Sequence, residues 1–180
     1  MDIRVGVGWD IHRLERGLPL VLGGVEIPHT HGLRGHSDAD ALTHAAVDAL
    51  LGAASLGDIG TLFPDTDPAY EGADSLELLK EAARRVRKRF AIMHIDSTVK
   101  AQMPLLRPHI PKMRKRMAEA AGIEIERMSV KAKTGERVGP VGRGEAIEAE
   151  AAATLRLIEG APSASNDSPS STSFPREQES

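Results

Sequence analysis

The sequence predicts one folded α/β domain. Segments in which apolar residues alternate with other residues, as in strands, are interspersed with segments whose apolar residues recur at helical spacing. At 180 residues the chain is long enough to bury one core, and with 41% hydrophobic but 3% aromatic residues that core is built from aliphatic side chains. The net charge of −3 does not indicate a nucleic acid or a membrane as the main partner.

The composition also limits the chemistry. The chain has no cysteine, which excludes disulfides, thiolate zinc fingers and cysteine nucleophiles, so metal ligands must come from His, Asp and Glu. No segment approaches the roughly 18 apolar residues of a membrane-spanning helix, and the N-terminus lacks the apolar region of a signal peptide. We therefore expect a cytoplasmic protein.

The first strand is predicted where apolar residues alternate with arginine and glycine over residues 3–9. Gly6 and Gly8 do not make a dinucleotide-binding fingerprint, because no third glycine or helix start follows. Residues 20–27 are predicted to form a hairpin through Gly23 and Gly24, and a solvated loop follows that contains His29 and His31.

The stretch 36–44 contains two histidines, two aspartates and a serine. Ser37, with an acid three residues later, predicts the start of a helix. Asp40, His44 and Asp48 recur every four residues, so we expect them to share one face of that helix. For a single histidine in such a helix, a satisfied core residue is the more common explanation.

The later elements follow from the same two periodicities. A capping signature at Asp74 starts a helix whose apolar stripe runs to Phe90. Residues 146–158 are rich in Ala and Glu, which favour a helix, but their apolar residues alternate, and we give this alternation more weight and predict a strand. The predictions are a strand over 92–101, a basic helix over 109–121, a strand over 127–133, a strand over 146–158, one domain over 1–160 and a disordered Ser/Pro-rich tail over 161–180.

Asp10 and His12 lie two residues apart on the predicted strand and therefore face the same side. Such a pair alone is more often an ordinary surface pair, but with His44 it makes a set of two imidazoles and one carboxylate. Three protein ligands with an open fourth position are typical of catalytic zinc, and hard cations are less suited to two imidazoles. Asp48 is expected to orient a ligand histidine from behind.

Three loops could take part in a site. Residues 58–68 offer acids to a polyol or a hydrated cation, or form an ordinary turn. Residues 102–111 precede a helix N-terminus and could make an anion or base pocket, or an ordinary connection. The glycine-rich residues 133–145 are not a Walker loop but could contact phosphate and its cation.

Together these motifs resemble the 2-C-methyl-D-erythritol 2,4-cyclodiphosphate synthase family, in the same order and over residues 3–158. The matching motifs are Gly8-Trp-Asp-Ile-His12, His36-Ser-Asp-Ala-Asp40, His44, Asp58-Ile-Gly60, Leu62-Phe-Pro-Asp-Thr-Asp67, Ala101-Gln102, Pro108-His-Ile-Pro111 and Gly142-Arg-Gly-Glu145.

The resemblance implies a homotrimer of α/β subunits, each a mixed β-sheet with helices on one face, with the sheets facing inward and the active sites between subunits. It implies a phosphorus–oxygen lyase of the non-mevalonate isoprenoid pathway. The substrate would be the small molecule 4-diphosphocytidyl-2-C-methyl-D-erythritol 2-phosphate, and the products would be the cyclic diphosphate and CMP. No nucleic acid or membrane partner is expected.

The resemblance also implies roles for individual residues. Zn²⁺, or another divalent transition metal, would bind Asp10, His12 and His44, Mg²⁺ or Mn²⁺ would bind Glu136, and His36 and Thr134 would be catalytic. The substrate-contacting residues would be Asp10, His12, His36, Ser37, Asp58, Ile59, Gly60, Phe63, Pro64, Asp65, Thr66, Asp67, Ala101, Gln102, Met103, Pro104, Leu105, Leu106, Arg107, Lys133, Thr134, Gly135, Glu136, Pro140 and Arg143.

This sequence departs from the family pattern at Lys133, Gly135 and Pro140. Two other functions stay open on the residues alone. One is a zinc-dependent phosphoester hydrolase, which would incorporate solvent oxygen into its product. The other is a trimeric metal- or isoprenoid-binding protein without activity, in which His44→Ala would leave ligand binding intact.

Overall fold

The computed structural model describes residues 2–64, 66–67, 70 and 72–160. Asp65 and the predicted tail over 161–180 lie outside the described residues. Within the described part of the chain, no helix is both long and apolar enough to cross a bilayer.

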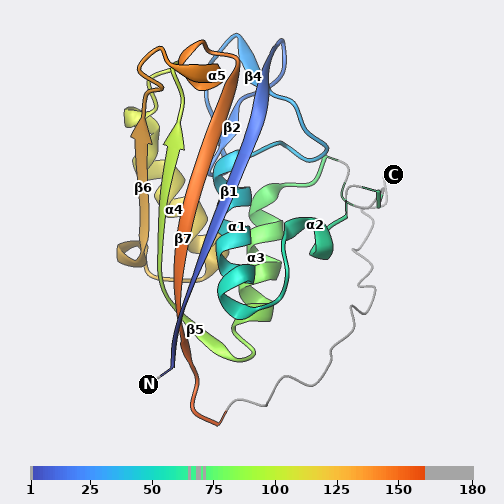
Figure 1. Cartoon of the computed structure of the whole chain (residues 1–180), viewed down its shortest axis with the longest axis vertical. Helices are drawn as coiled ribbons and strands as arrows, with labels where there is room; N and C mark the ends of the chain where they lie inside the picture. The colour runs from blue at the N-terminus through green and yellow to red at the C-terminus, as the bar shows by residue number, and fades with distance from the viewer. Residues whose placement is uncertain (1, 65, 68–69, 71, 161–180) are drawn as a thin grey trace, which may run out of the picture.

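In the described chain, five strands form a mixed sheet in the order β4-β1-β7-β5-β6 (Figure 1). β5 and β6 are parallel and the other neighbours are antiparallel. The strands are β1 (Ile3–Arg16), β4 (His31–Leu33), β5 (Phe90–Lys100), β6 (Met128–Lys133) and β7 (Ala146–Leu157), with a separate hairpin of β2 (Val21–Leu22) and β3 (Val25–Glu26).

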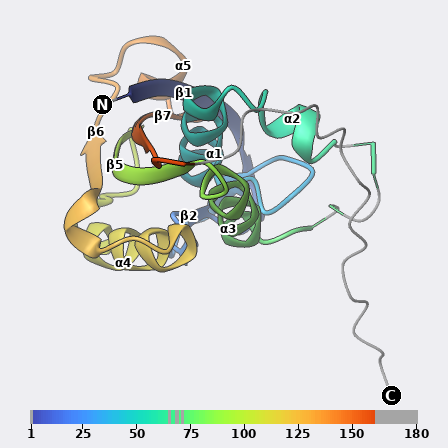
Figure 2. The same cartoon turned by 90° about the horizontal axis from the view of Figure 1, so that it is seen from below.

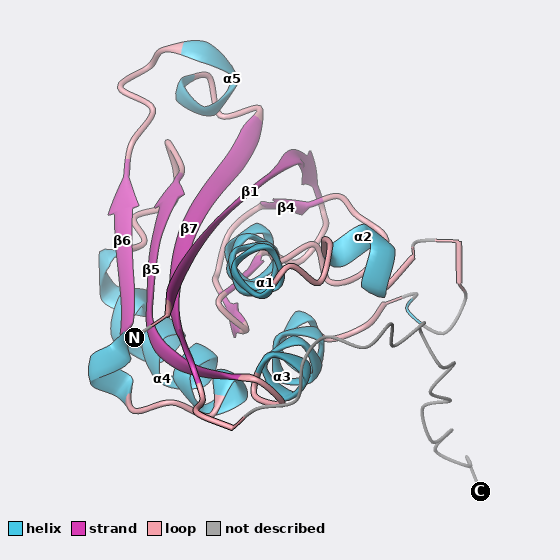
Figure 3. Cartoon of the chain, turned by 60° about the horizontal axis from the view of Figure 1, so that its bottom comes forward, coloured by secondary structure: helices cyan, strands magenta, loops and turns pink. Residues whose placement is uncertain are grey.

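Three longer helices, α1 (Ala41–Ala54), α3 (Ser75–Val86) and α4 (Ile110–Ala121), cover one face of the sheet. The sheet curls around α1, as Figures 2 and 3 show from two further directions. Among the described residues, two single-turn α-helices lie in loops, α2 (Ile59–Leu62) after α1 and α5 (Gly139–Gly142) before β7. Two short 3₁₀ helices, η2 (Arg107–His109) and η3 (Ile125–Arg127), precede α4 and β6. The expected mixed sheet with helices on one face is therefore confirmed.

Helix α1 packs very closely against β1. A Cβ atom on Gly8 would lie 2.0 Å from the carbonyl oxygen of Ala45, and one on Gly6 would lie 2.2 Å from that of Ala49. No side chain fits in such a gap, so glycine is required for the approach. Gly6 and Gly8 therefore have a structural role: they allow α1 to pack directly against β1.

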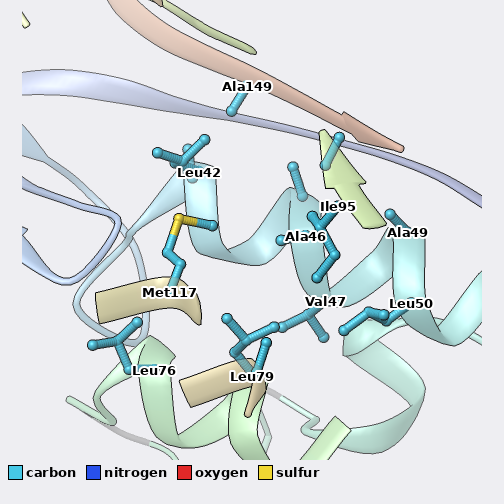
Figure 4. Packing of buried hydrophobic residues seen from close by; sticks show 14 of the residues in the cluster. Leu42, Ala46, Val47, Ala49, Leu50, Leu76, Leu79, Ile95, Met117 and Ala149 are labelled. Atoms are coloured by element: carbon cyan, nitrogen blue, oxygen red, sulfur yellow. The ribbon is translucent and has the colours of Figure 1, made fainter. Parts of the chain in front are cut away.

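The core lies between the sheet and the helices and is aliphatic, as the composition predicts (Figure 4). Leu42 and Leu50 of α1 lie in one cluster with Leu79 of α3, Met117 of α4 and Ile95 of β5, and each of these side chains is buried. The contiguous core fixes the position of α1 relative to β1, on which the site depends.

The face of β1 without helices is apolar and exposed. Val5, Val7 and Trp9 point away from the glycine side and are 67%, 72% and 53% exposed. The neighbouring strands carry charge on the same face, where Lys100 pairs with Glu148 at 2.9 Å and with Glu150 at 2.6 Å. The strand alternation was therefore predicted correctly, but its glycines rather than its large apolar residues face the core.

Three local predictions are wrong. Helix α1 begins after Asp40, which is its N-cap, and not at Ser37. Phe90 starts β5 instead of ending the stripe of α3. His31 begins the edge strand β4, where Arg16 pairs with it, instead of lying in a loop. The strands predicted over 92–101, 127–133 and 146–158 and the helix over 109–121 are confirmed within two residues at each end.

Candidate metal centre and pocket

Asp10, His12 and His44 meet where β1 runs past the first turn of α1. Asp10 Oδ2 lies 3.0 Å from His12 Nε2 and 2.9 Å from His44 Nδ1, and the two nitrogens are 3.3 Å apart. Among the described residues these three form the group of His, Asp and Glu side chains whose ligand atoms lie within 4.8 Å of one another. The sequence-predicted metal set is brought together.

The three donor atoms fit a small divalent cation. In a tetrahedral zinc site with bonds of about 2.0–2.2 Å, donor atoms lie about 3.3–3.6 Å apart, close to the separations in this triangle. All three groups are partly buried, and His12 Nδ1 contacts the carbonyl oxygen of Arg34 at 2.9 Å. Because a carbonyl only accepts, this bond leaves the Nε2 lone pair of His12 facing the triangle.

The electrostatics of the triangle favour charge on Asp10. Burial raises the pKa of the Asp10 carboxyl, but the hydrogen bonds and charges of His12 and His44 outweigh burial and hold that pKa far below its usual value. Burial lowers the pKa of His12, and its bond to Asp10 reverses this, so that the pKa of His12 is raised. A cation bound in the triangle would take over the stabilisation of the carboxylate that the two imidazoles now provide.

The start of α1 is fixed by a buried carboxylate. Asp40 is fully buried and accepts hydrogen bonds from the backbone N–H groups of Gly23 and Gly24, at 2.9 and 2.7 Å, and from Thr43. Burial raises the pKa of Asp40, and these donors partly offset the increase. The expectation that Asp40 shares the face of His44 is therefore wrong, because Asp40 turns into the core before the helix begins.

Asp48 does not orient a ligand histidine, contrary to prediction. Its carboxylate accepts a hydrogen bond from Ile59 N–H at 2.7 Å, which joins α1 to α2. Burial raises the pKa of Asp48, the bond to Ile59 lowers it, and the nearby charges of Asp58 and Asp10 raise it further. His44 Nε2 instead contacts two hydroxyls, Ser75 Oγ at 2.9 Å and Ser37 Oγ at 3.1 Å.

A pocket of about 330 Å³ opens beside the metal triangle. The resemblance predicted five of its lining residues as substrate contacts in addition to the metal ligands. Tyr70 and Leu78 were missed, because the sequence around Tyr70 has no helix or strand period and Leu78 has the spacing of an ordinary core position of α3. The lining residues are His12, His36, Ser37, His44, Ile59, Gly60, Phe63, Tyr70 and Leu78.

The loop around this pocket is held by backbone bonds. Gly72 N–H donates to His36 O at 2.9 Å, and Asp38 N–H donates to Ala73 O at 3.2 Å. Phe63 is buried, and its ring packs edge-on against Tyr70 with the centroids 5.4 Å apart. Asp58 caps α2 by accepting from Thr61 N–H, while Pro64, Thr66 and Asp67 continue the loop.

The remaining predicted site residues gather at the far side of the sheet. Ala101 N–H donates to Lys133 O at 2.9 Å, Arg137 N–H donates to Gln102 Oε1 at 3.2 Å, and Thr134 Oγ1 donates to the Glu136 carboxylate. β7 and β5 separate β6 from β1, and three strand spacings of about 4.8 Å give about 14 Å. Within one chain these residues do not share the pocket of the metal triangle.

Individual side chains in this second group differ in exposure. Ala101 and Leu106 are buried in the core, whereas Met103 and Leu105 are 60% and 70% exposed. Pro104 continues the same loop, Arg107 begins the short 3₁₀ helix η2 (Arg107–His109), and Gly135 packs its backbone against that of Gly142. Pro140 lies in α5, and the exposed Arg143 pairs with Glu145 at 2.7 Å.

Comparisons with known proteins give a consistent result. The model of the YgbB family matches residues 3–156. The 2-C-methyl-D-erythritol 2,4-cyclodiphosphate synthase of Ralstonia pickettii is 58% identical over 89% of this chain and 96% of its own length. The bifunctional enzyme IspD/IspF of Albidiferax ferrireducens is 60% identical over 87% of this chain, which spans 38% of that longer protein.

Solved structures show the same fold. The bifunctional IspDF from Campylobacter jejuni superposes with a TM-score of 0.83 at 42% identity, over 87% of this chain and 43% of that chain. A 2C-methyl-D-erythritol-2,4-cyclodiphosphate synthase in a CDP-bound form superposes with a TM-score of 0.77 at 38% identity, over 85% of this chain and 100% of that chain. At these identities the likeness extends beyond the fold to the family.

Proposed function

Since the chain belongs to the YgbB family, we propose that it converts 4-diphosphocytidyl-2-C-methyl-D-erythritol 2-phosphate into 2-C-methyl-D-erythritol 2,4-cyclodiphosphate and CMP. This is a step of the non-mevalonate route to isoprenoid precursors. We take residues 1–160 as one catalytic domain, the reaction as a cyclising phosphorus–oxygen lyase reaction, and the cytoplasm as its location.

One observation carries the proposal: Asp10, His12 and His44 converge beside a pocket that His36 and Ser37 also line. The pocket holds both polar groups, which suit a phosphate, and the apolar wall of Phe63 and Leu78. A metal triangle without such a pocket would suit a structural ion. A pocket without the triangle would lack a cation to neutralise the negative charge of a diphosphate.

The donor set indicates which ions the site would take. Zn²⁺, or another divalent transition metal, would be held by Asp10, His12 and His44, and Mg²⁺ or Mn²⁺ by the exposed carboxylate of Glu136. When bound, such cations neutralise phosphate charge and polarise phosphorus–oxygen bonds.

In the proposed reaction the substrate attacks itself. An oxygen of its 2-phosphate bonds to the β-phosphorus, the bond from that phosphorus to the oxygen bridging toward the α-phosphorus breaks, and CMP leaves with that oxygen. The nucleophile is anionic near neutral pH, so no protein base is required. The chain orients the bound substrate, so that binding offsets the entropy cost of ring closure. The pocket wall limits access of water to the reacting groups.

Individual residues divide these tasks. His36 and Thr134 contact the phosphates and stabilise the charge that develops on them. Ser37, Asp58, Ile59 and Gly60 hold the erythritol part, and the 63–67 loop continues that surface. Residues 101–107 form the cytosine pocket, with Lys133, Gly135, Pro140 and Arg143 around the phosphates.

We further propose that the active protein is a homotrimer with its sheets facing inward. The exposed apolar stripe of Val5, Val7 and Trp9 on β1 supports this, since a surface of this kind on a helix-free sheet face usually meets a partner. The separation of the metal triangle from Thr134 and Glu136 supports it too. A neighbouring subunit would supply the second group to the first.

The experiment combines the purified chain with the diphosphocytidyl substrate, with and without a chelator. We expect CMP and a cyclic diphosphate in equal amounts, no ¹⁸O incorporation from labelled water, and loss of turnover on chelation or in His44→Ala. Incorporation of solvent oxygen would favour a hydrolase instead. Intact ligand binding with no turnover by the wild-type chain would leave a binding protein, and either result would overturn the proposal.

A further inference from the structure

The imidazole of His44 is held on the side away from the metal triangle. Its Nδ1 faces Asp10 and His12, and its Nε2 lies 2.9 Å from the hydroxyl oxygen of Ser75. Ser75 is fully buried at the first position of α3 and is itself bonded to Asp38. We propose that Ser75 and Asp38 are positioning residues that hold His44 in the tautomer whose Nδ1 lone pair faces the cation, an inference that rests on the proposed metal-dependent function.

The direction of each hydrogen bond follows from the chemistry of the groups. Asp38 accepts two hydrogen bonds from Ser75: Oδ1 accepts from the Ser75 hydroxyl, and Oδ2 accepts from Ser75 N–H at 3.1 Å. A carboxylate only accepts, and a hydroxyl has one proton to donate. Because that proton goes to Asp38, the oxygen of Ser75 can only accept from His44. The bond to Ser75 therefore requires a proton on Nε2 of His44, and a neutral imidazole with its proton there has its lone pair on Nδ1, where a metal can bind.

The relay of Asp38, Ser75 and His44 is rigid because backbone hydrogen bonds and a helix cap fix the two segments that carry Asp38 and Ser75. Asp38 N–H donates to Ala73 O at 3.2 Å, and Asp74 caps the helix that Ser75 begins. The relay therefore joins two segments that are 37 residues apart in sequence. Holding the ring in this way reduces the rotamer freedom that His44 would lose on binding an ion.

A second hydroxyl, that of Ser37, lies 3.1 Å from His44 Nε2 and is less well placed to set the tautomer. Its oxygen also accepts from Ala39 N–H at 3.2 Å, and the residue is only partly buried at the pocket. No carboxylate contact to Ser37 is found among the described residues to fix the direction of its proton. Ser75, and not Ser37, therefore determines which tautomer of His44 is favoured.

The relay opposes the pull of Asp10. Asp10 Oδ2 lies 2.9 Å from His44 Nδ1 and would accept a proton from that nitrogen when no metal is bound. A proton on Nδ1 blocks coordination, so it must leave or move to Nε2 before an ion can bind. By accepting from Nε2–H, Ser75 stabilises the metal-binding tautomer and lowers the cost of this step.

Two variants of the full-length chain test the relay with Zn²⁺ alone as the probe. Ser75→Ala removes the acceptor for Nε2–H. Asp38→Asn replaces one acceptor oxygen with an NH₂ group, so Ser75 can turn its proton toward His44 and favour the wrong tautomer. We expect each variant to bind Zn²⁺ about 10- to 100-fold more weakly in a competition titration against a chromophoric chelator. In the Zn²⁺-loaded protein, the Nε2–H proton signal of His44 should be protected from exchange in the wild type and lost in Ser75→Ala.

Ser97→Ala is the matched control, because Ser97 is also a buried serine but donates to Ser129 O at 2.9 Å within the sheet. It should leave both the Zn²⁺ affinity and the His44 signal unchanged. Affinity within twofold of wild type in either relay variant would overturn the role of that residue. Neither readout requires turnover, so a wild-type chain that releases no CMP yet shows the relay effect would refute only the proposed function.

Discussion

Asp48 accepts a hydrogen bond from the backbone N–H of Ile59 at 2.7 Å, and this bond ties α1 to α2 beside the pocket. Asp48 lies one helical turn after His44, and Ile59 and Gly60 line the pocket. The helix that carries the proposed metal ligand His44 therefore also holds the wall on which the erythritol part of the proposed substrate would rest.

We predict that Asp48→Ala raises KM for the proposed substrate about tenfold, with a smaller change in kcat. The lost bond is worth about 1.4 kcal/mol, and it holds the binding wall without touching the reacting phosphates. Steady-state kinetics on CMP release measures both constants. Asp48→Asn is the control, since its amide oxygen can still accept from Ile59 N–H. A wild-type KM in Asp48→Ala would contradict the role.

The convergence of Asp10, His12 and His44 could be predicted from the sequence because local rules fix how two of these side chains point. Asp10 and His12 share a face of any strand, and His44 lies in the next long amphipathic segment. The roles of Asp40 and Asp48 could not be predicted, because their partners are Gly23, Gly24 and Ile59, which local periodicity does not place beside them. The link from Ser75 to His44 spans 31 residues and leaves no mark in local patterns.

The glycine face of β1 gives the second prediction: Gly8→Ala should destabilise the fold by about 2–4 kcal/mol. The new Cβ would lie 2.0 Å from Ala45 O and 2.7 Å from Ala49 N, and both atoms belong to helix backbone that must shift as a whole. Urea denaturation at fixed protein concentration measures the loss of free energy of unfolding.

Gly52→Ala is the matched control for Gly8→Ala. Gly52 lies on the exposed side of α1, and a Cβ there would meet no described atom within 4 Å. Alanine should therefore stabilise the helix by about 0.5–1 kcal/mol. Equal and small effects at the two glycines would show that the close approach of α1 to β1 is not what the glycine at position 8 provides.

The same strand shows why alternation alone does not give the buried side. Both sides of β1 fit a strand, one with Gly6 and Gly8 and one with Val5, Val7 and Trp9. An isolated chain would be expected to bury the larger apolar side. The core instead forms on the glycine side, because only there can the backbone of α1 pack directly against the strand. The apolar side is left exposed in the single chain.

The third prediction is that Asp40→Asn costs about 3 kcal/mol of stability. All the partners of this fully buried carboxylate are donors, from Gly23, Gly24 and Thr43, and an amide would turn an NH₂ group toward some of them. Asp74→Asn is the control, because Asp74 is an exposed N-cap and asparagine caps equally well. Urea denaturation of both variants should separate them clearly, and similar midpoints would refute the anchoring role of Asp40.

The fourth prediction concerns the acid stability of α3. Hydrogen bonds from Arg84, and then from Arg85, outweigh burial and lower the pKa of Glu81 from its ordinary 4.5 to about 2. A carboxyl whose pKa is lower in the folded chain than in the unfolded chain stabilises the fold above the unfolded value, and this stabilisation is lost as the pH falls toward the folded value. For Glu81 that window runs from about pH 4.5 down to about pH 2.

Glu81→Gln should therefore lower the free energy of unfolding by about 1 kcal/mol near pH 7, a value reduced for solvent screening. The difference from wild type should shrink as the pH falls below about 4.5 and vanish near pH 2. Urea titrations at a series of pH values measure it, with Glu77→Gln as the control, because Glu77 pairs with Lys80 while 55% exposed and should contribute little. A difference that stays constant across this window would mean that Glu81 stabilises α3 through packing and not through its charge.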